Sequence, residues 1–66
     1  MAVKHPEINE QAGFGTIVIE ADDGQDYEYD VPGSWSIEKA LDYAFLAFEE
    51  EHPALEVVAF NDHWFL

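Results

Sequence analysis

Apolar and acidic residues alternate from Asp26 to Val31, and this is the clearest β-strand pattern in the chain. The period of two in DYEYDV is typical of a strand that buries one of its faces. The preceding run Gly15–Ala21 (GTIVIEA) is short and rich in β-branched residues, so it predicts a second strand. Asp23-Gly24 lies between the two runs. The pattern therefore predicts a β-hairpin over residues 15–31.

The hydrophobic pattern also predicts the register of this hairpin. A two-residue turn at Asp23-Gly24 would place Ile19 opposite Glu28 and mix the two faces. A three-residue loop, Asp22-Asp23-Gly24 with glycine in the left-handed conformation, would pair Ile19 with Tyr27 and Ile17 with Tyr29. We expect the three-residue loop. The outward face would then carry Thr16, Val18 and Glu20 beside Asp30, Glu28 and Asp26.

A helix is predicted over residues 36–51. Ser36 is a favourable N-cap, the first helical residue would be Ile37, and His52-Pro53 would end the helix. Apolar residues recur with the helical period over about four turns. The predicted stripe consists of Ile37, Ala40, Leu41, Ala44, Phe45 and Phe48. On the other faces, Glu38, Asp42 and Glu49 line one flank, while Tyr43, Leu46 and Glu50 lie away from the stripe.

Leu55–Phe60 (LEVVAF) predicts a third strand. Asn61-Asp62 offers a turn into a short fourth strand, His63–Leu66, although the glycine usual in such turns is absent. The fold class is therefore α+β: a small antiparallel sheet, ββαβ or ββαββ, with one amphipathic helix packed on one face. Residues 1–14 would form an irregular arm. In the core, Ile17, Ile19, Tyr27 and Tyr29 would meet Leu41, Phe45 and Phe48. Trp35 and the C-terminal Trp64-Phe65-Leu66 are expected to complete it.

Composition agrees with one small folded domain over residues 1–66. A hydrophobic content of 48% excludes the weakly hydrophobic, highly charged class of disordered chains. There is no cysteine, so neither a disulfide nor a cysteine-based metal site can form. The first residues, MAVKHPEINE, contain no apolar run typical of a signal peptide, and no stretch approaches the roughly 20 apolar residues of a membrane span. We expect a soluble protein.

Charge changes this picture more than any other property. Fifteen acidic residues against two basic ones give a net charge of −13, beyond the magnitude of about 2–8 that solubility requires in a small domain. Such a chain repels nucleic acids and anionic membranes and attracts basic proteins. Direct nucleic-acid binding is therefore not expected.

Many of the acidic residues lie where they oppose local stability. Glu20 would face Asp26 across the hairpin as a like-charge pair, and Glu49-Glu50-Glu51 crowd the negative end of the helix dipole. Their placement suggests that they bind a partner. An exposed Leu46 surrounded by acids is typical of an interface, but also of an ordinary surface leucine. The predicted partner-binding residues are Glu20, Asp22, Asp23, Asp26, Glu28, Asp30, Glu38, Asp42, Leu46 and Glu49.

No pattern in the chain predicts a metal, a cofactor or catalysis. His5, His52 and His63 fit no metal-binding motif, and ADDGQDYEYD lacks the residue spacing of a calcium loop. Ser34 and Ser36 are explained as turn and cap residues, and no glycine-rich phosphate loop is present. We therefore expect a protein that is not an enzyme and binds neither cofactor nor metal.

In overall character the chain resembles the DNA-mimic proteins of phages and mobile elements, and among these the small acidic anti-CRISPR proteins. The resemblance rests on a tiny, lysine-poor, cysteine-free α+β domain with rows of acids on a hairpin and a helix. It implies an inhibitor in the host cytoplasm that occupies the basic DNA-binding surface of a target, such as a type I surveillance complex. Two alternatives remain: an immunity or antitoxin protein for a basic nuclease, and a salt-adapted acidic interaction module.

Overall fold

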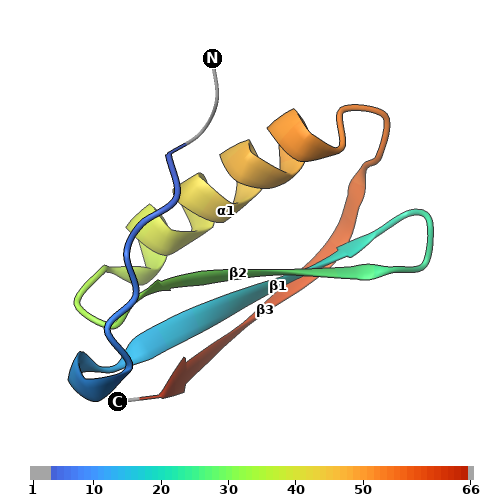
Figure 1. The fold of residues 1–66 in the computed structure, drawn as a ribbon. Coiled ribbons are helices and arrows are strands. Elements are labelled where there is room, and N and C mark those ends of the chain that lie inside the picture. The colour runs from blue at the N-terminus through green and yellow to red at the C-terminus, as the bar shows by residue number, and fades with distance from the viewer. Residues whose placement is uncertain (1–3, 66) are drawn as a thin grey trace.

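The computed structural model describes residues 4–65 and has the expected α+β fold, with elements in the order ββαβ (Figure 1). The strands β1 (Phe14–Ala21), β2 (Asp26–Pro32) and β3 (Val57–Phe65) form one antiparallel sheet in the order β2-β1-β3. The helix α1 (Ile37–Glu51) covers one face of this sheet. In the described part of the chain, no helix is long and apolar enough to span a membrane.

The β1–β2 hairpin has the predicted register. Ile19 pairs with Tyr27 and Ile17 with Tyr29, while Glu20 lies opposite Asp26. The loop closes through a hydrogen bond of 3.0 Å from the Ala21 N–H to the Gln25 carbonyl oxygen. Gly24 has φ of +82°, so the third loop position uses the left-handed conformation that glycine adopts without steric cost.

The helix has the predicted ends, but the face that it buries is rotated from the predicted stripe. The Ser36 hydroxyl oxygen accepts a hydrogen bond of 3.2 Å from the Lys39 N–H, and the helix ends at Glu51. Its buried residues are Ala40, Ala44, Ala47 and Phe48. Of the predicted stripe, Leu41 and Phe45 are only half-buried and Ile37 is 40% exposed. Conversely, Tyr43 was expected away from the core and is half-buried against it.

This rotation follows from what packs against each side of the helix. The three buried alanines carry little bulk, so the helix backbone can approach the sheet closely. Tyr43 meets Tyr29 of β2 edge-on, with ring centroids 6.4 Å apart, and Phe45 meets Phe60 of β3 edge-on, with ring centroids 5.3 Å apart. The sheet contributes the remaining buried apolar residues of the core: Ile17, Ile19, Ala21, Tyr29 and Val31.

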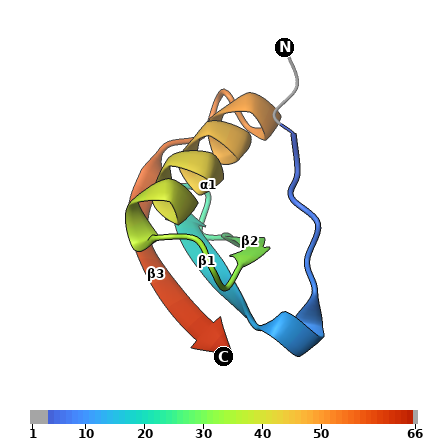
Figure 2. The ribbon, with the colours of Figure 1, turned by 90° about the vertical axis from the view of Figure 1, so that its left-hand side faces the viewer.

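The C-terminal segment is one continuous strand, so the predicted turn at Asn61-Asp62 and the fourth strand are wrong. β3 pairs with β1 along its length, from Phe65 opposite Phe14 to Val57 opposite Ala21, with one irregularity near Glu20. Because β1 is eight residues long, it offers hydrogen-bonding partners beyond Asn61, and the strand continues. Leu66, which would have ended the fourth strand, lies outside the described residues. Figure 2 shows β3 along one edge of the sheet.

The aromatic residues expected to complete the core do so only in part. Trp35 is half-buried and meets Tyr43 edge-on, with ring centroids 5.7 Å apart. Trp64 is half-buried over Gly15. Phe65 is 56% exposed and stacks on Phe14. The core therefore becomes thin toward β3.

The segment before β1 runs along the side of α1 and β2 (Figure 2) and contains a short 3-10 helix, Glu10–Ala12. It is attached to the domain at both ends. The Gly33 N–H donates to the Gly13 carbonyl oxygen over 3.1 Å. At the other end, His5 Nδ1 lies 2.6 Å from the Tyr43 hydroxyl oxygen and His5 Nε2 lies 3.6 Å from Glu51.

Candidate functional site

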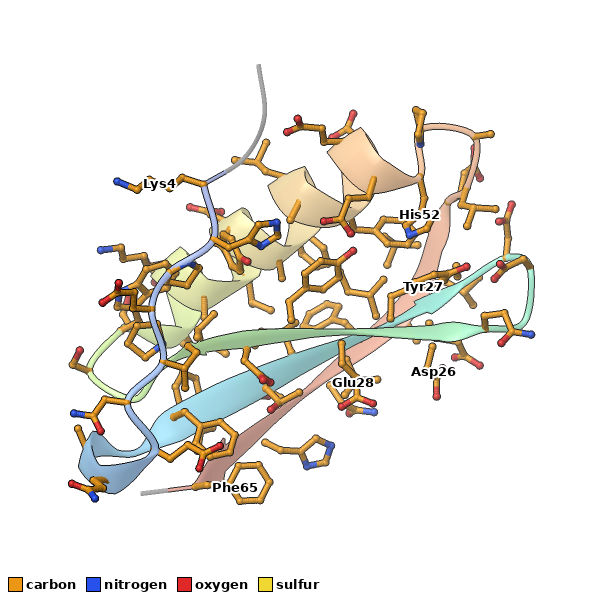
Figure 3. All side chains as sticks on the ribbon, viewed as in Figure 1. Lys4, Asp26, Tyr27, Glu28, His52 and Phe65 are labelled. Atoms are coloured by element: carbon orange, nitrogen blue, oxygen red, sulfur yellow. The ribbon has the colours of Figure 1, made fainter. Side chains whose placement is uncertain are left out.

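The sheet face turned away from α1 gathers four of the predicted partner-binding acids. Neighbouring residues across the three strands share a face, and the pairing gives four rows, of which the row Pro32–Phe14–Phe65 at one end is apolar. The other three rows are Asp30–Thr16–His63, Glu28–Val18–Asn61 and Asp26–Glu20–Ala59. We call these nine residues the acidic sheet face. In Figure 3, Asp26 and Glu28 point away from α1, whereas Tyr27, between them in sequence, points toward α1 and His52.

The acids of β2 form a straight row because side chains two apart on a strand project from the same face. Their spacing is about 7 Å, of the same order as the phosphate spacing along a nucleic-acid strand. Asp30 accepts a hydrogen bond of 2.8 Å from the hydroxyl of Thr16, which is buried, so this carboxylate is held in place.

The other three acids of this face are exposed. Within residues 4–65, the carboxylates of Glu20, Asp26 and Glu28 take part in no side-chain hydrogen bond or ion pair. They are therefore available to an external cation.

The two acids of the hairpin loop have structural roles as well as charge. Asp22 joins the loop to the segment before β3, because its carboxylate accepts from the Glu56 N–H over 3.2 Å. Asp23 accepts from the Tyr27 hydroxyl over 2.7 Å and from the Gln25 N–H over 2.9 Å. The Tyr27 bond, followed by the Gln25 bond, lowers the pKa of Asp23, so this carboxylate stays ionised. Both residues therefore lie at the end of the acidic sheet face in a defined loop.

The predicted helix residues lie on a different surface. Glu38, Asp42, Leu46 and Glu49 are exposed on α1, and their helical positions point away from the sheet beneath the helix. The acidic sheet face is on the opposite side of that sheet, as the labelled Asp26 and Glu28 show in Figure 3. A single flat partner therefore cannot contact both sets. Leu46 is 59% exposed, but Tyr43 does not join it, because Tyr43 turns toward His5 and Trp35.

Neither lysine neutralises the acidic sheet face. The Lys39 ammonium lies over the Trp35 ring, 4.5 Å from its centroid, at the start of α1. Lys4 lies on the N-terminal arm, far from the labelled acids in Figure 3. Among residues 4–65, no group of three or more histidine, cysteine, aspartate or glutamate side chains is arranged to hold a metal ion. The face carries uncompensated negative charge.

Sequence reasoning missed the contribution of β3 to this face. Asn61 and His63 lie beside Val18 and Thr16 because the strand continues past Phe60. The missing glycine at Asn61-Asp62 was the available signal that no turn forms there. A shallow hollow lies here, lined by Val18, Glu20, Asp26, Ala59, Phe60 and Asn61.

The hollow has the chemistry to bind an arginine or lysine side chain. The aliphatic stem of such a residue can lie on Val18, while its charged end reaches Glu20 or Asp26. No protein-family model, curated protein or solved structure matches the chain.

Proposed function

We propose that the protein is a non-enzymatic inhibitor whose acidic sheet face occupies the basic nucleic-acid-binding surface of a target protein. The observation that supports this most strongly is the grouping of Glu20, Asp26, Glu28 and Asp30 on one side of a sheet that carries no lysine. Arginine and lysine residues that bind phosphate would pair with these carboxylates instead.

The arrangement of the acids supports mimicry of a nucleic-acid strand in particular. Three carboxylates follow one strand at regular spacing, as phosphates follow a backbone. Asn61 and Thr16 add polar groups beside the row, and Val18 gives an apolar contact for the stem of a basic side chain. The resemblance to small acidic anti-CRISPR proteins makes a type I surveillance complex the first target to test.

The test is a competition experiment in which the protein displaces labelled double-stranded DNA from such a complex. The site variant combines Asp26→Asn, Glu28→Gln and Asp30→Asn, which removes three charges and keeps the side-chain shapes. The matched control combines Glu38→Gln, Asp42→Asn and Glu49→Gln, which removes the same charge from the exposed side of α1. We expect the site variant to lose at least about tenfold in inhibition, since each lost charge contact is worth about 0.5 kcal/mol or more.

The control should retain most of its inhibition, and inhibition by the wild type should weaken as salt rises, because exposed charges are screened. Equal losses in both variants would mean that only total charge matters, and a larger loss in the control would assign binding to α1. A wild type that never displaces DNA from this complex would rule out that target. A wild type that folds only in molar potassium chloride would instead indicate salt adaptation.

A further inference from the structure

Within residues 4–65, the strand β3 is an uncovered and apolar edge of the sheet. It forms one end of the order β2-β1-β3 and is nine residues long. Its exposed fractions are 64% for Val58, 56% for Phe65, 46% for Phe60 and 42% for Val57. Such a strand presents unpaired backbone N–H and C=O groups on its outer side, ready to pair with another strand.

The opposite edge of the sheet is protected in the ways that natural proteins use. β2 carries three carboxylates in seven residues and ends at Pro32, and both features discourage strand addition. The N-terminal arm also lies beside it, where Pro6 and Ile8 line a hollow together with Glu28 and Asp30. β3 has no proline and no lysine, and its only acid is Asp62. The two edges therefore differ in their readiness to pair.

We propose that two copies of this protein pair through β3, antiparallel and about a two-fold axis, to form one six-stranded sheet. The charge distribution makes β3 the part of the surface where two copies can meet. Each copy carries −13, so like-charged copies can approach only where acids are sparse, and β3 has one acid in nine residues. Because a two-fold contact uses the same edge twice, the protected β2 edges remain outside and the assembly closes at two copies.

A register centred on Asn61 gives the best match of residues. It sets Asn61 against Asn61 of the second copy, and Asp62 against Phe60 of the second copy, which avoids a direct pair of aspartates. The irregularity of β3 at Val58 confines the regular part of this pairing to residues 59–63.

The surface that two copies would bury is that of a weak dimer. The two phenylalanines leave roughly 100 Å² each exposed, and with the valines a pair of copies would bury at most roughly 700 Å² of side chain, before the backbone edges are counted. Specific interfaces begin at about 1,200 Å² of total buried surface. We therefore expect a dimer that dissociates on dilution.

The dimer does not depend on the proposed function, and its response to salt distinguishes the two. Mutual repulsion of two acidic copies weakens when salt screens it, so raising salt should strengthen the dimer. Binding to a basic target should respond in the opposite direction.

The experiment is sedimentation velocity of the full chain from micromolar to millimolar concentration, at low and at high salt. The test variant is Val58→Lys, and the control is Leu46→Lys, which adds the same charge at a similarly exposed site on α1. We expect a concentration-dependent dimer that is stronger in high salt. Val58→Lys should raise its dissociation constant about tenfold or more, whereas Leu46→Lys should leave it equal or slightly lower.

A wild type that stays monomeric at every concentration and salt would overturn the proposal. So would equal effects of the Val58→Lys and Leu46→Lys substitutions on the dissociation constant. Circular dichroism shows whether each variant folds. If Val58→Lys does not fold, amide hydrogen exchange on the wild type decides the question. The outward-facing amides of β3 should gain protection as concentration rises, and unchanged protection in a sample that forms dimers would assign the contact elsewhere.

Discussion

Replacing Glu20 by glutamine should stabilise the fold, because Glu20 lies directly opposite Asp26 in the hairpin. Side chains of directly opposed residues start about 5 Å apart, and both carboxylates are exposed to water. Two unit charges about 6 Å apart in water repel by about 0.7 kcal/mol, which lies within the range of about 0.2–1 kcal/mol measured for cross-strand pairs. Removing one charge therefore raises the free energy of unfolding by about 0.5 kcal/mol after partial screening.

The assay is thermal unfolding followed by circular dichroism. In a domain of this size, about 0.5 kcal/mol corresponds to a rise in Tm of about 2–4 °C. At about 1 M salt the Debye length falls to about 3 Å, shorter than the separation of the charges, so most of the difference between variant and wild type should disappear. A stabilisation that survives high salt would come from a new amide–carboxylate hydrogen bond instead of relief from repulsion.

The matched control is Glu7→Gln, which removes the same charge from an exposed residue of the N-terminal arm. Glu7 belongs to no strand and so has no cross-strand neighbour. It should change Tm by less than Glu20→Gln does. Equal stabilisation by both variants would show that total charge, and not the Glu20–Asp26 pair, opposes folding, and would remove this reason for assigning the hairpin acids to function.

Two further predictions concern the core. Gly15→Ala should destabilise the fold by about 1–3 kcal/mol and change the near-ultraviolet circular dichroism, because a Cβ there would lie 2.5 Å from the Trp64 ring. At Gly24 a Cβ would meet open space, but φ is +82°. Gly24→Ala should therefore lower the free energy of unfolding by about 1–2 kcal/mol without changing the near-ultraviolet spectrum. The same spectral change in both variants would contradict the packing argument. Burial, followed by the negative charge of Glu51, raises the pKa of the Tyr29 hydroxyl. The neutral hydroxyl therefore contributes fully to stability below the ordinary tyrosine pKa of about 10, and this contribution is lost as the pH rises above that value. In alkaline titrations followed by tyrosinate absorbance and circular dichroism, Tyr29→Phe should therefore lose less stability above about pH 10 than the wild type loses, and parallel losses would refute this assignment.

The hairpin was predictable because two independent local signals agree. The alternation around Tyr27 and Tyr29 selects the buried face, and a glycine suited to the left-handed conformation stands at position 24. Their agreement leaves one register, and that register places Glu20, Asp26 and Glu28 on the same side of the sheet. This part of the candidate site follows from the sequence because it depends only on neighbours within a single hairpin.

The features that could not be predicted depend on segments far apart in the chain. Asn61-Asp62 has turn-forming residues, yet it continues as strand because β1 offers backbone partners there. Asp62 lies on the helix side of the sheet, and it is tolerated because β3 is left exposed and the Trp64 indole N–H donates to it over 2.6 Å. The rotation of α1 toward Tyr43 likewise depends on Tyr29 and on His5, which the helical pattern alone does not include.

If both proposals hold, self-association and target binding reinforce each other despite their opposite salt responses. A two-fold axis perpendicular to a continuous sheet leaves both helices on one side and both acidic sheet faces on the other. The two β2 rows would then be separated by five strand spacings, about 24 Å, before twist is considered. A target with two basic strips at that distance would bind the dimer with an effective-concentration advantage that a monomer lacks. Val58 lies outside the acidic sheet face, so Val58→Lys should weaken such binding only at concentrations where the wild type is dimeric, whereas loss of the β2 acids should weaken it at every concentration.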